Sequence, residues 1–161
     1  MQTVRIAPAD PDDRGVADLL FTAIGGDRTR LAAATRRYRS DGSTELVAAT
    51  IGDELAGVAG YEIGHDHLVL MHLATAGTHR RTGIGRLLVA DIGSRHPDLP
   101  VVAETDGTSV GFYAAIGFTG VPLGEKYPGV PRFRMTLGSD SARATAGPAA
   151  DDAGTSRVIG G

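Results

Sequence analysis

The sequence of 161 residues contains no cysteine, which excludes disulfides, thiolate metal sites and a cysteine nucleophile. Tryptophan is also missing, and aromatic residues make up only 5% of the chain. A core of this composition has to rely mainly on Leu, Val, Ile and Ala. No apolar run approaches the length that crosses a bilayer, and the N-terminus lacks the basic and apolar segments of a signal peptide. We therefore expect a cytoplasmic protein with no membrane partner.

Lysine is almost absent, because Lys126 is the only one and every other fixed cation is an arginine. The formal net charge is -3, whereas a general nucleic-acid binder normally carries a basic face. We therefore expect no nucleic-acid partner. The other residues, 42% hydrophobic and 22% charged, are typical of a soluble domain, and the length allows one domain with a proper core rather than two.

Hydrophobic periodicity and turn residues divide the chain into strands and helices. Strands are predicted over residues 3–10, 44–52, 54–64, 66–76, 98–106, 118–124 and 132–137. Helices are predicted over residues 12–24, 28–42, 84–92 and 108–117. Either Asp10 or Asp12 is expected to cap the first helix. The order β-α-α-β-β-β-α-β-α-β-β describes an α/β domain with a mixed sheet, in which the second to fourth strands form an antiparallel meander.

The third predicted helix has four apolar residues on one face. These residues are Ile84, Leu87, Leu88 and Ile92. We expect this face to pack against the sheet.

The composition changes after Leu137. Residues 138–161 consist largely of Ala, Gly, Ser and Asp and contain almost no large apolar side chain. Such a segment cannot bury enough surface to offset the entropy that it loses on ordering. We therefore assign residues 1–138 to the domain and predict that residues 139–161 form a disordered tail.

A strand–turn–helix junction contains two glycines, Gly83 and Gly85, among three arginines. The free backbone N–H groups at the start of a helix and the helix dipole favour an anion at such a junction. The glycines allow a phosphate to approach the backbone, and Arg80, Arg81 and Arg86 can add charge-assisted hydrogen bonds. Two glycines can also simply shape a tight link between strand and helix. The three arginines favour a site for a pyrophosphate.

Two common phosphate-binding loops do not fit this junction. A P-loop requires a lysine directly after its last glycine, and Lys126 lies far from any such loop. A dinucleotide-binding loop requires a third glycine, where this chain has Leu88. Glu104 lies near the distance expected of a ribose-binding acid, but the preceding strands indicate an antiparallel meander. NAD binding is therefore disfavoured.

The stretch HLATAGTHRRTGIGRLLV resembles the acyl-CoA-binding motif of the GNAT superfamily of N-acetyltransferases. The signature of that motif, [Q/R]-x-x-G-x-[G/A], is met by Arg80, Gly83 and Gly85. The strand before it normally ends in an apolar run, as Leu73 and its two successors do here.

A second stretch, DGTSVGFYAAIGF, resembles the GNAT pattern N-x-x-A-x-x-F-Y-x-x-x-G-F. It agrees at Phe112, Tyr113 and the final Gly-Phe pair. It departs at Asp106, where the family usually has Asn, and at Ser109, where the family usually has Ala. The two motifs occur in the family's order of elements, so the resemblance covers residues 3–137.

The resemblance implies the GNAT fold, with a mixed central sheet of about seven strands flanked by about four helices. It also implies an enzyme that transfers an acetyl group from acetyl-CoA to the primary amine of a small molecule or peptide, without a metal. Homodimers are common in the family, so a homodimer is left open here. The alternative is a non-catalytic GNAT-fold module that binds acyl-CoA as a sensor or interaction partner.

The resemblance further implies which residues contact acetyl-CoA. The thioester would lie along the strand at residues 66–76, and the pyrophosphate would contact amides at the start of the following helix. The implied cofactor-binding residues are Leu73, Ala74, Thr75, Arg80, Arg81, Thr82, Gly83, Ile84, Gly85, Arg86, Asp106, Ser109 and Phe112. A carboxylate at position 106 is a less suitable neighbour for anionic CoA than the usual amide.

Tyr113 is the candidate general acid. A phenol with a pKa of about 10 stays protonated at neutral pH and can donate to a thiolate with a pKa of about 8.5. The other interpretation is that Tyr113 is an aromatic residue on the packing face of its helix, beside Phe112.

The general base is harder to assign. Family members often carry it at the positions of Met71 and Val69, and neither side chain can accept a proton. His72 lies between them, so strand alternation directs it to the opposite face and favours a structural role. Glu104, which we take as the catalytic candidate, and Glu62 are alternatives. A water chain, or an amine that arrives neutral, would need no base.

Two further clusters have simpler interpretations. His65, Asp66 and His67 resemble a metal site only in composition, because no further ligand is suitably spaced, and we predict polar turn residues and no metal. The arginines of the second predicted helix are expected to form a solvated face, on which three could meet an acidic acceptor. These three are Arg36, Arg37 and Arg39. Nothing in the sequence identifies the acceptor.

Overall fold

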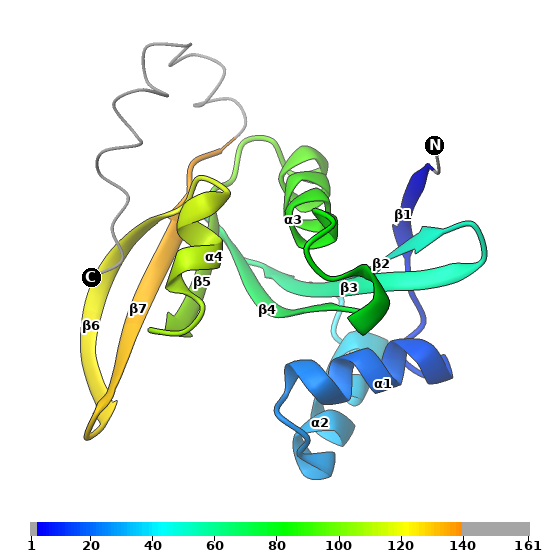
Figure 1. The fold of residues 1–161 in the computed structure, drawn as a ribbon, viewed down its shortest axis with the longest axis horizontal. Coiled ribbons are helices and arrows are strands. Elements are labelled where there is room, and N and C mark those ends of the chain that lie inside the picture. Colours follow the sequence, from blue (N-terminus) through cyan, green and yellow to red (C-terminus); the bar gives the residue numbers. More distant parts are fainter. Residues whose placement is uncertain (1–2, 140–161) are drawn as a thin grey trace. The chain divides into compact units, whose positions relative to one another are not determined.

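The computed structural model describes residues 3–139, which contain seven strands and four α-helices. The strands are β1 (Val4–Pro8), β2 (Thr44–Ile51), β3 (Glu54–Ile63), β4 (Leu68–Thr75), β5 (Val101–Asp106), β6 (Thr119–Tyr127) and β7 (Val130–Leu137). The helices are α1 (Arg14–Ala23), α2 (Arg28–Ser40), α3 (Ile84–Arg95) and α4 (Val110–Ala115), with a short 3-10 helix η1 (Gly77–His79). The strands form a mixed sheet in the order β1-β2-β3-β4-β5-β7-β6 (Figure 1). The predicted α/β class with a mixed sheet is confirmed.

The described chain divides into two compact units. Unit one contains residues 3–65 and 70–92, and unit two contains residues 66–69 and 93–139. The predicted disordered tail lies outside the described residues except for Ser139. Within residues 3–139 no helix is long and apolar enough to cross a membrane.

In unit one, the sheet is covered by helices on both faces (Figure 1). β2 pairs antiparallel with β1 on one side and with β3 on the other. On one face, Val16 and Leu20 of α1 form a buried cluster with Val58 and two further sheet residues. On the opposite face, a Cβ atom at Gly57 would lie 2.8 Å from Cγ2 of Ile84 in α3. The strict alternation of a strand explains why neighbours in β3 face different helices, and only a glycine lets α3 approach this closely.

Helix α1 begins two residues later than expected. The side chain of Asp13 caps it by accepting hydrogen bonds from the N–H groups of Gly15 and Val16 at 3.1 Å and 3.3 Å. The prediction of Asp10 or Asp12 as the cap was therefore wrong. Asp10 instead accepts from the N–H group of Asp12 at 2.8 Å and closes the turn before the helix. Asp10, Asp12 and Asp13 lie within four residues of one another, so residue type alone does not identify which of them caps the helix.

The buried apolar face of α3 is rotated relative to the predicted one. Ile84, Leu88, Val89 and Ile92 are buried, but Leu87 is 42% exposed. Val89 therefore takes the place in the buried face that the periodicity assigns to Leu87. Aromatic residues are few in the sequence, but two of them, Tyr61 and Phe118, are the largest fully buried side chains of the core.

In unit two, the first residues of β4 pair parallel with β5, and β7 pairs antiparallel with both β5 and β6. The β6–β7 hairpin is longer than predicted. Residues 125–131, predicted to lie between the two strands, belong mostly to them, and the strands meet at a turn where Gly129 has φ 81°. Pro128 and Gly129 suit a tight turn, so the strand continues past Gly124, where the sequence predicts its end.

Gly60 of β3 makes room for Tyr38 of α2. A Cβ atom at position 60 would overlap the hydroxyl oxygen and Cζ of Tyr38 and would lie 2.9 Å from its Cε1. We expect Gly60→Ala to lower the free energy of unfolding by about 1–3 kcal/mol, the usual cost of overpacking a core. Urea unfolding measures this change.

Gly42→Ala is the control for Gly60→Ala, because nothing lies within 4 Å of a Cβ atom at that position. The two variants should differ clearly in their urea midpoints. Equal stability would show that Tyr38 does not occupy the space above Gly60.

Candidate active site

The junction between β4 and α3 adopts an unusual backbone conformation. Arg81 has φ 62°, the only non-glycine residue with positive φ in the described part of the chain, and Gly83 has φ 85°. The first helical hydrogen bond runs from the N–H group of Leu87 to the carbonyl oxygen of Gly83 at 3.0 Å. The N–H groups at positions 84 to 86 therefore have no partner four residues earlier within the helix. The junction presents a set of backbone donors at the positive end of the α3 dipole.

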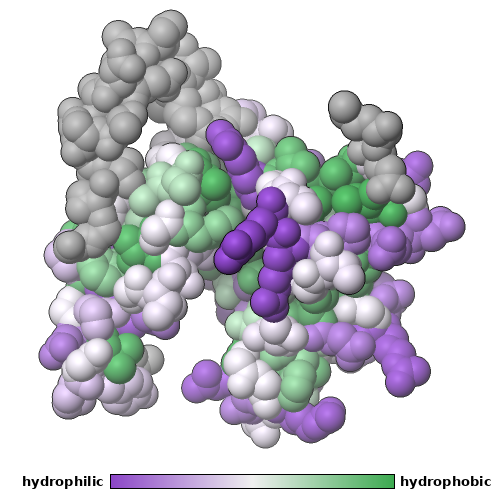
Figure 2. Space-filling view, viewed as in Figure 1, coloured by the Kyte–Doolittle hydropathy of each residue, from purple (hydrophilic) through white to green (hydrophobic). Residues whose placement is uncertain are grey.

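The arginines of this junction are exposed. Arg80, Arg81 and Arg86 make no ion pair with any acid between residues 3 and 139. Hydrophilic side chains gather over the start of α3 (Figure 2). Three unpaired cations beside free N–H groups make this surface electropositive, which favours an anion.

The other residues of the junction stabilise its shape. The hydroxyl group of Thr82 donates to the carbonyl oxygen of His79 and closes the turn. Ile84 is 2% exposed and Gly85 is buried, so their side-chain positions face the protein. Ligand contacts at these two positions would come from the backbone.

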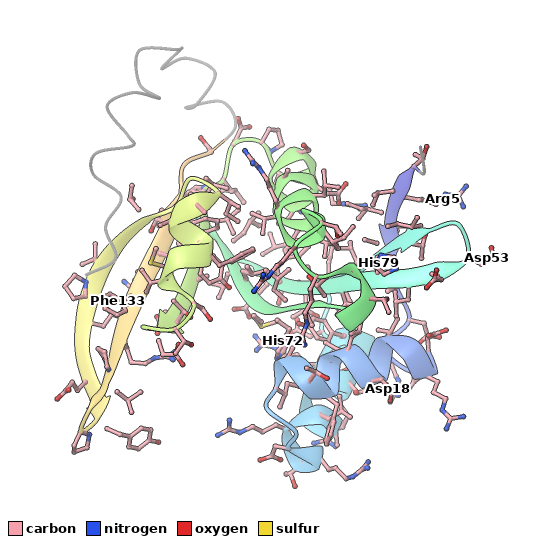
Figure 3. All side chains as sticks on the ribbon, viewed as in Figure 1. Arg5, Asp18, Asp53, His72, His79 and Phe133 are labelled. Atoms are coloured by element: carbon pink, nitrogen blue, oxygen red, sulfur yellow. The ribbon has the colours of Figure 1, made fainter. Side chains whose placement is uncertain are left out.

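His79 is a further residue of this turn, and no sequence pattern predicts a role for it (Figure 3). Its side chain is 15% exposed, and its Nε2 lies 3.7 Å from a carboxylate oxygen of Glu54 at the start of β3. Nε2 has no hydrogen-bond partner within residues 3–139. The ring therefore packs the turn against β3, and no sequence pattern indicates the distant Glu54.

The predicted thioester segment forms the end of β4. Leu73 and Thr75 are half-buried, whereas Ala74 belongs to the buried cluster beneath α1. The chain stays attached to β3 just beyond this point, because the N–H group of Ala76 donates to the carbonyl oxygen of Ala56 at 2.8 Å. Because side chains alternate along a strand, those of residues 73 and 75 lie on the face of β4 opposite to this cluster.

His72 contacts helix α2. The hydroxyl oxygen of Tyr38 lies 2.5 Å from Nδ1 of His72, and in Figure 3 His72 lies between β4 and the helices α1 and α2. Met71 also contacts α2, since its sulfur accepts from a guanidinium nitrogen of Arg37 at 3.4 Å. Met71 and His72 therefore approach the same helix, although simple alternation predicts contacts on opposite faces.

Burial shifts the pKa values of the Tyr38–His72 pair. Burial raises the pKa of the Tyr38 hydroxyl well above its ordinary value. Burial, and to a smaller extent the nearby Arg37, lowers the pKa of His72. Both side chains are therefore neutral near pH 7.

The carboxylates considered as bases are paired with arginines. Glu62 forms an ion pair with Arg37 in unit one. Glu104 lies 3.2 Å from a guanidinium nitrogen of Arg134, opposite it in the β5–β7 register, in unit two. Each pairing occupies a carboxylate oxygen that a general base would need.

The arginines proposed to meet an acidic acceptor are partly neutralised. Arg37 also lies 3.5 Å from Asp41, and Arg39 contacts Asp12 at 2.5 Å. Arg37 thus pairs with the residue that caps the C-terminal end of α2, and Arg39 links α2 to the segment before α1.

In unit two, Tyr113 of α4 lies between two aromatic rings. Its ring centroid is 5.1 Å from that of Phe112 and 5.1 Å from that of Phe118, both in edge-on geometry. Burial raises the pKa of Tyr113 above its ordinary value, so the phenol stays protonated across the neutral range. Phe112 is 40% exposed and presents an apolar edge to solvent.

Asp106 closes the turn that leads into α4. Its Oδ1 accepts from the hydroxyl and the N–H group of Thr108 at 2.6 Å and 2.9 Å. These hydrogen bonds to Thr108 lower the pKa of Asp106. Ser109 caps α4 without a side-chain hydrogen bond. The carboxylate therefore has a local structural role.

The metal interpretation of the turn at residues 65–67 gains no support. Nδ1 of His67 lies 2.6 Å from Asp66. Among residues 3–139, no group of three or more His, Asp or Glu side chains is placed to hold a metal ion.

A mixed sheet of seven strands with four helices, in this order along the chain, matches the fold of GNAT acetyltransferases. The family model for the acetyltransferase (GNAT) domain matches residues 14–138. The chain belongs to the GNAT acetyltransferase family, and the predicted membership and fold are confirmed.

Solved structures of acetyltransferases share this fold at low sequence identity. A GNAT-family protein from Desulfovibrio desulfuricans is 20% identical, with a TM-score of 0.69, over 84% of this chain and 99% of that one. A Bacillus subtilis acetyltransferase in complex with CoA is 19% identical, with a TM-score of 0.65, over 84% and 99%. The ribosomal-protein-S18-alanine N-acetyltransferase of Escherichia coli is 14% identical, with a TM-score of 0.64, over 84% and 93%. Comparison with curated sequences found no match.

Proposed function

We propose that the protein is an N-acetyltransferase that transfers an acetyl group from acetyl-CoA to the primary amine of a small molecule or peptide. The observation that carries this proposal is the start of α3, with its free N–H groups and three unpaired arginines. The CoA complex of the B. subtilis neighbour is consistent with a CoA ligand. Membership in the GNAT family supports acetyl transfer as the class of reaction. The proposal specifies the acceptor only as an amine.

The residues present fit the pyrophosphate of CoA. Nothing lies within 4 Å of a Cβ position at Gly83, so a phosphate can approach the backbone there. Arg80, Arg81 and Arg86 supply positive charge against the phosphates. The backbone at Leu73 and Thr75 would place the acetyl group.

The reaction is a direct transfer. The neutral amine attacks the thioester carbonyl carbon, a C–N bond forms, and the C–S bond breaks. Tyr113 donates its proton to the departing thiolate, and the nitrogen loses its surplus proton to water or to a base such as Glu104. The raised pKa of Tyr113 supports this role, because the phenol remains protonated before the thiolate leaves.

A second candidate function is a non-catalytic module that binds acyl-CoA. It is favoured by the apolar side chains of Val69 and Met71 and by the ion pairs that engage Glu62 and Glu104. Such a module would keep the pyrophosphate site and lack turnover.

Calorimetric titration with acetyl-CoA, and with NAD as the control, tests the proposed ligand. We expect binding of acetyl-CoA in the micromolar range and none of NAD, because the junction lacks the third glycine of a dinucleotide site. Release of free CoA with added amines then separates the enzyme from the binding module. Failure to bind acetyl-CoA would leave neither function standing.

A further inference from the structure

The Tyr38–His72 pair joins α2 to β4 within unit one. Their rings meet edge-on with centroids 5.6 Å apart, and the hydroxyl oxygen lies 2.5 Å from Nδ1. Gly60 leaves the space that the hydroxyl group occupies. A glycine inside a strand lowers the stability of the protein. The contact between Tyr38 and His72 is therefore accompanied by a loss of stability in β3.

The hydrogen bonds of the pair determine the tautomer of His72. The hydroxyl group of Tyr38 is protonated, and among residues 3–139 its only hydrogen-bond partner is Nδ1 of His72. No other acceptor lies within reach among these residues, so the hydroxyl group donates its proton to Nδ1. The neutral imidazole therefore carries its single proton on Nε2.

This tautomer makes Nε2 of His72 a donor and not a base. Within the described residues Nε2 has no hydrogen-bond partner, and His72 is only half-buried. The ring is held at Nδ1 by Tyr38, so the direction of the Nε2–H bond is fixed. A half-buried donor of fixed direction is suited to orient an oxygen atom of a ligand.

The charges near the pair favour a neutral oxygen. The guanidinium of Arg37 is shared between the carboxylates of Glu62 and Asp41. With two negative charges around one positive charge, no net positive charge remains to hold a carboxylate. An amide carbonyl oxygen accepts a hydrogen bond without such a charge.

We propose that His72 orients the acceptor by donating from Nε2 to a neutral amide carbonyl oxygen next to the attacking amine. Tyr38 is the positioning residue that holds the imidazole. This inference rests on the proposed function, because His72 immediately precedes Leu73, where the acetyl group is proposed to lie. The acceptor class is therefore an amine with an adjacent amide, as at the N-terminus of a peptide.

Two amines of similar shape test the proposal. L-Alaninamide carries the amide carbonyl, and sec-butylamine has the same branched carbon without it. Free CoA is measured with a thiol reagent, which reports CoA alone because the chain contains no cysteine. Wild-type protein, His72→Leu and His72→Gln are compared in kcat/KM for each amine, so that differences in amine basicity cancel.

His72→Leu should lower kcat/KM for L-alaninamide roughly 10- to 100-fold, the range expected for one lost hydrogen bond. It should leave sec-butylamine within about twofold. His72→Gln retains an N–H donor and should recover most of the loss. Tyr38→Phe frees the ring and should lower the preference for L-alaninamide over sec-butylamine. Acetyl-CoA affinity should stay constant in all variants.

Nitrogen-15 NMR of the full chain provides an independent readout, in which the neutral His72 ring should show its proton on Nε2. A proton on Nδ1 overturns the proposal. The proposal is also overturned if His72→Leu lowers kcat/KM equally for both amines or for neither. Acetyl-CoA binding without turnover of L-alaninamide overturns the acceptor class and leaves the proposed function standing. Absence of acetyl-CoA binding refutes the proposed function itself.

Discussion

Tyr113→Phe should lower turnover roughly 10²- to 10⁴-fold, the usual effect of removing a general acid. The substitution removes one oxygen atom and keeps the ring that packs between Phe112 and Phe118. Acetyl-CoA affinity should therefore hardly change. Single-turnover kinetics with a saturating amine, beside calorimetric titration, separates the chemical step from binding.

The pH dependence adds a second test of Tyr113. The acid acts only while protonated, and burial raises its pKa above the ordinary value of about 10. Activity should therefore show no decline attributable to Tyr113 at any pH below about 10. Tyr127→Phe, the same change at a side chain that is 62% exposed, is the control in the same unit. Equal turnover in the two variants would remove Tyr113 from the mechanism.

Gly83→Val should weaken acetyl-CoA binding roughly 10- to 100-fold, because it removes one or two charge-assisted contacts between backbone and phosphate. The branched side chain would occupy the open space through which a phosphate approaches the α3 start. Calorimetric titration measures the change in affinity.

Gly25→Val is the matched control for Gly83→Val. Both glycines have φ 85°, and neither has an atom within 4 Å of a Cβ position. The backbone strain of the two substitutions should therefore be similar, and both variants should show a comparable drop in melting temperature. Only Gly83→Val should lose affinity. If both bind acetyl-CoA equally well, the pyrophosphate does not lie at the start of α3.

The candidate site was predictable where its parts are close in sequence. Gly83, the three arginines and the helix that follows lie within one short segment, and their chemistry depends on the local backbone. The aromatic pair at Phe112 and Tyr113 is local in the same sense. Periodicity also predicted the order of the strands and helices, although the turn at Gly129 and the exposed Leu87 show that boundaries and helix faces depend on the neighbours.

The sequence by itself determined the junction rich in glycine and arginine, the aromatic motif and the succession of elements, because each follows from residues within a few positions of one another. Tertiary structure alone decided that Tyr38 and His72, 34 residues apart, share a hydrogen bond, and that Gly60 has to be small. It also decided that arginines engage Glu62 and Glu104. The reason is physical: a side chain's tautomer, charge state and free hydrogen-bonding atoms depend on partners that only packing brings together.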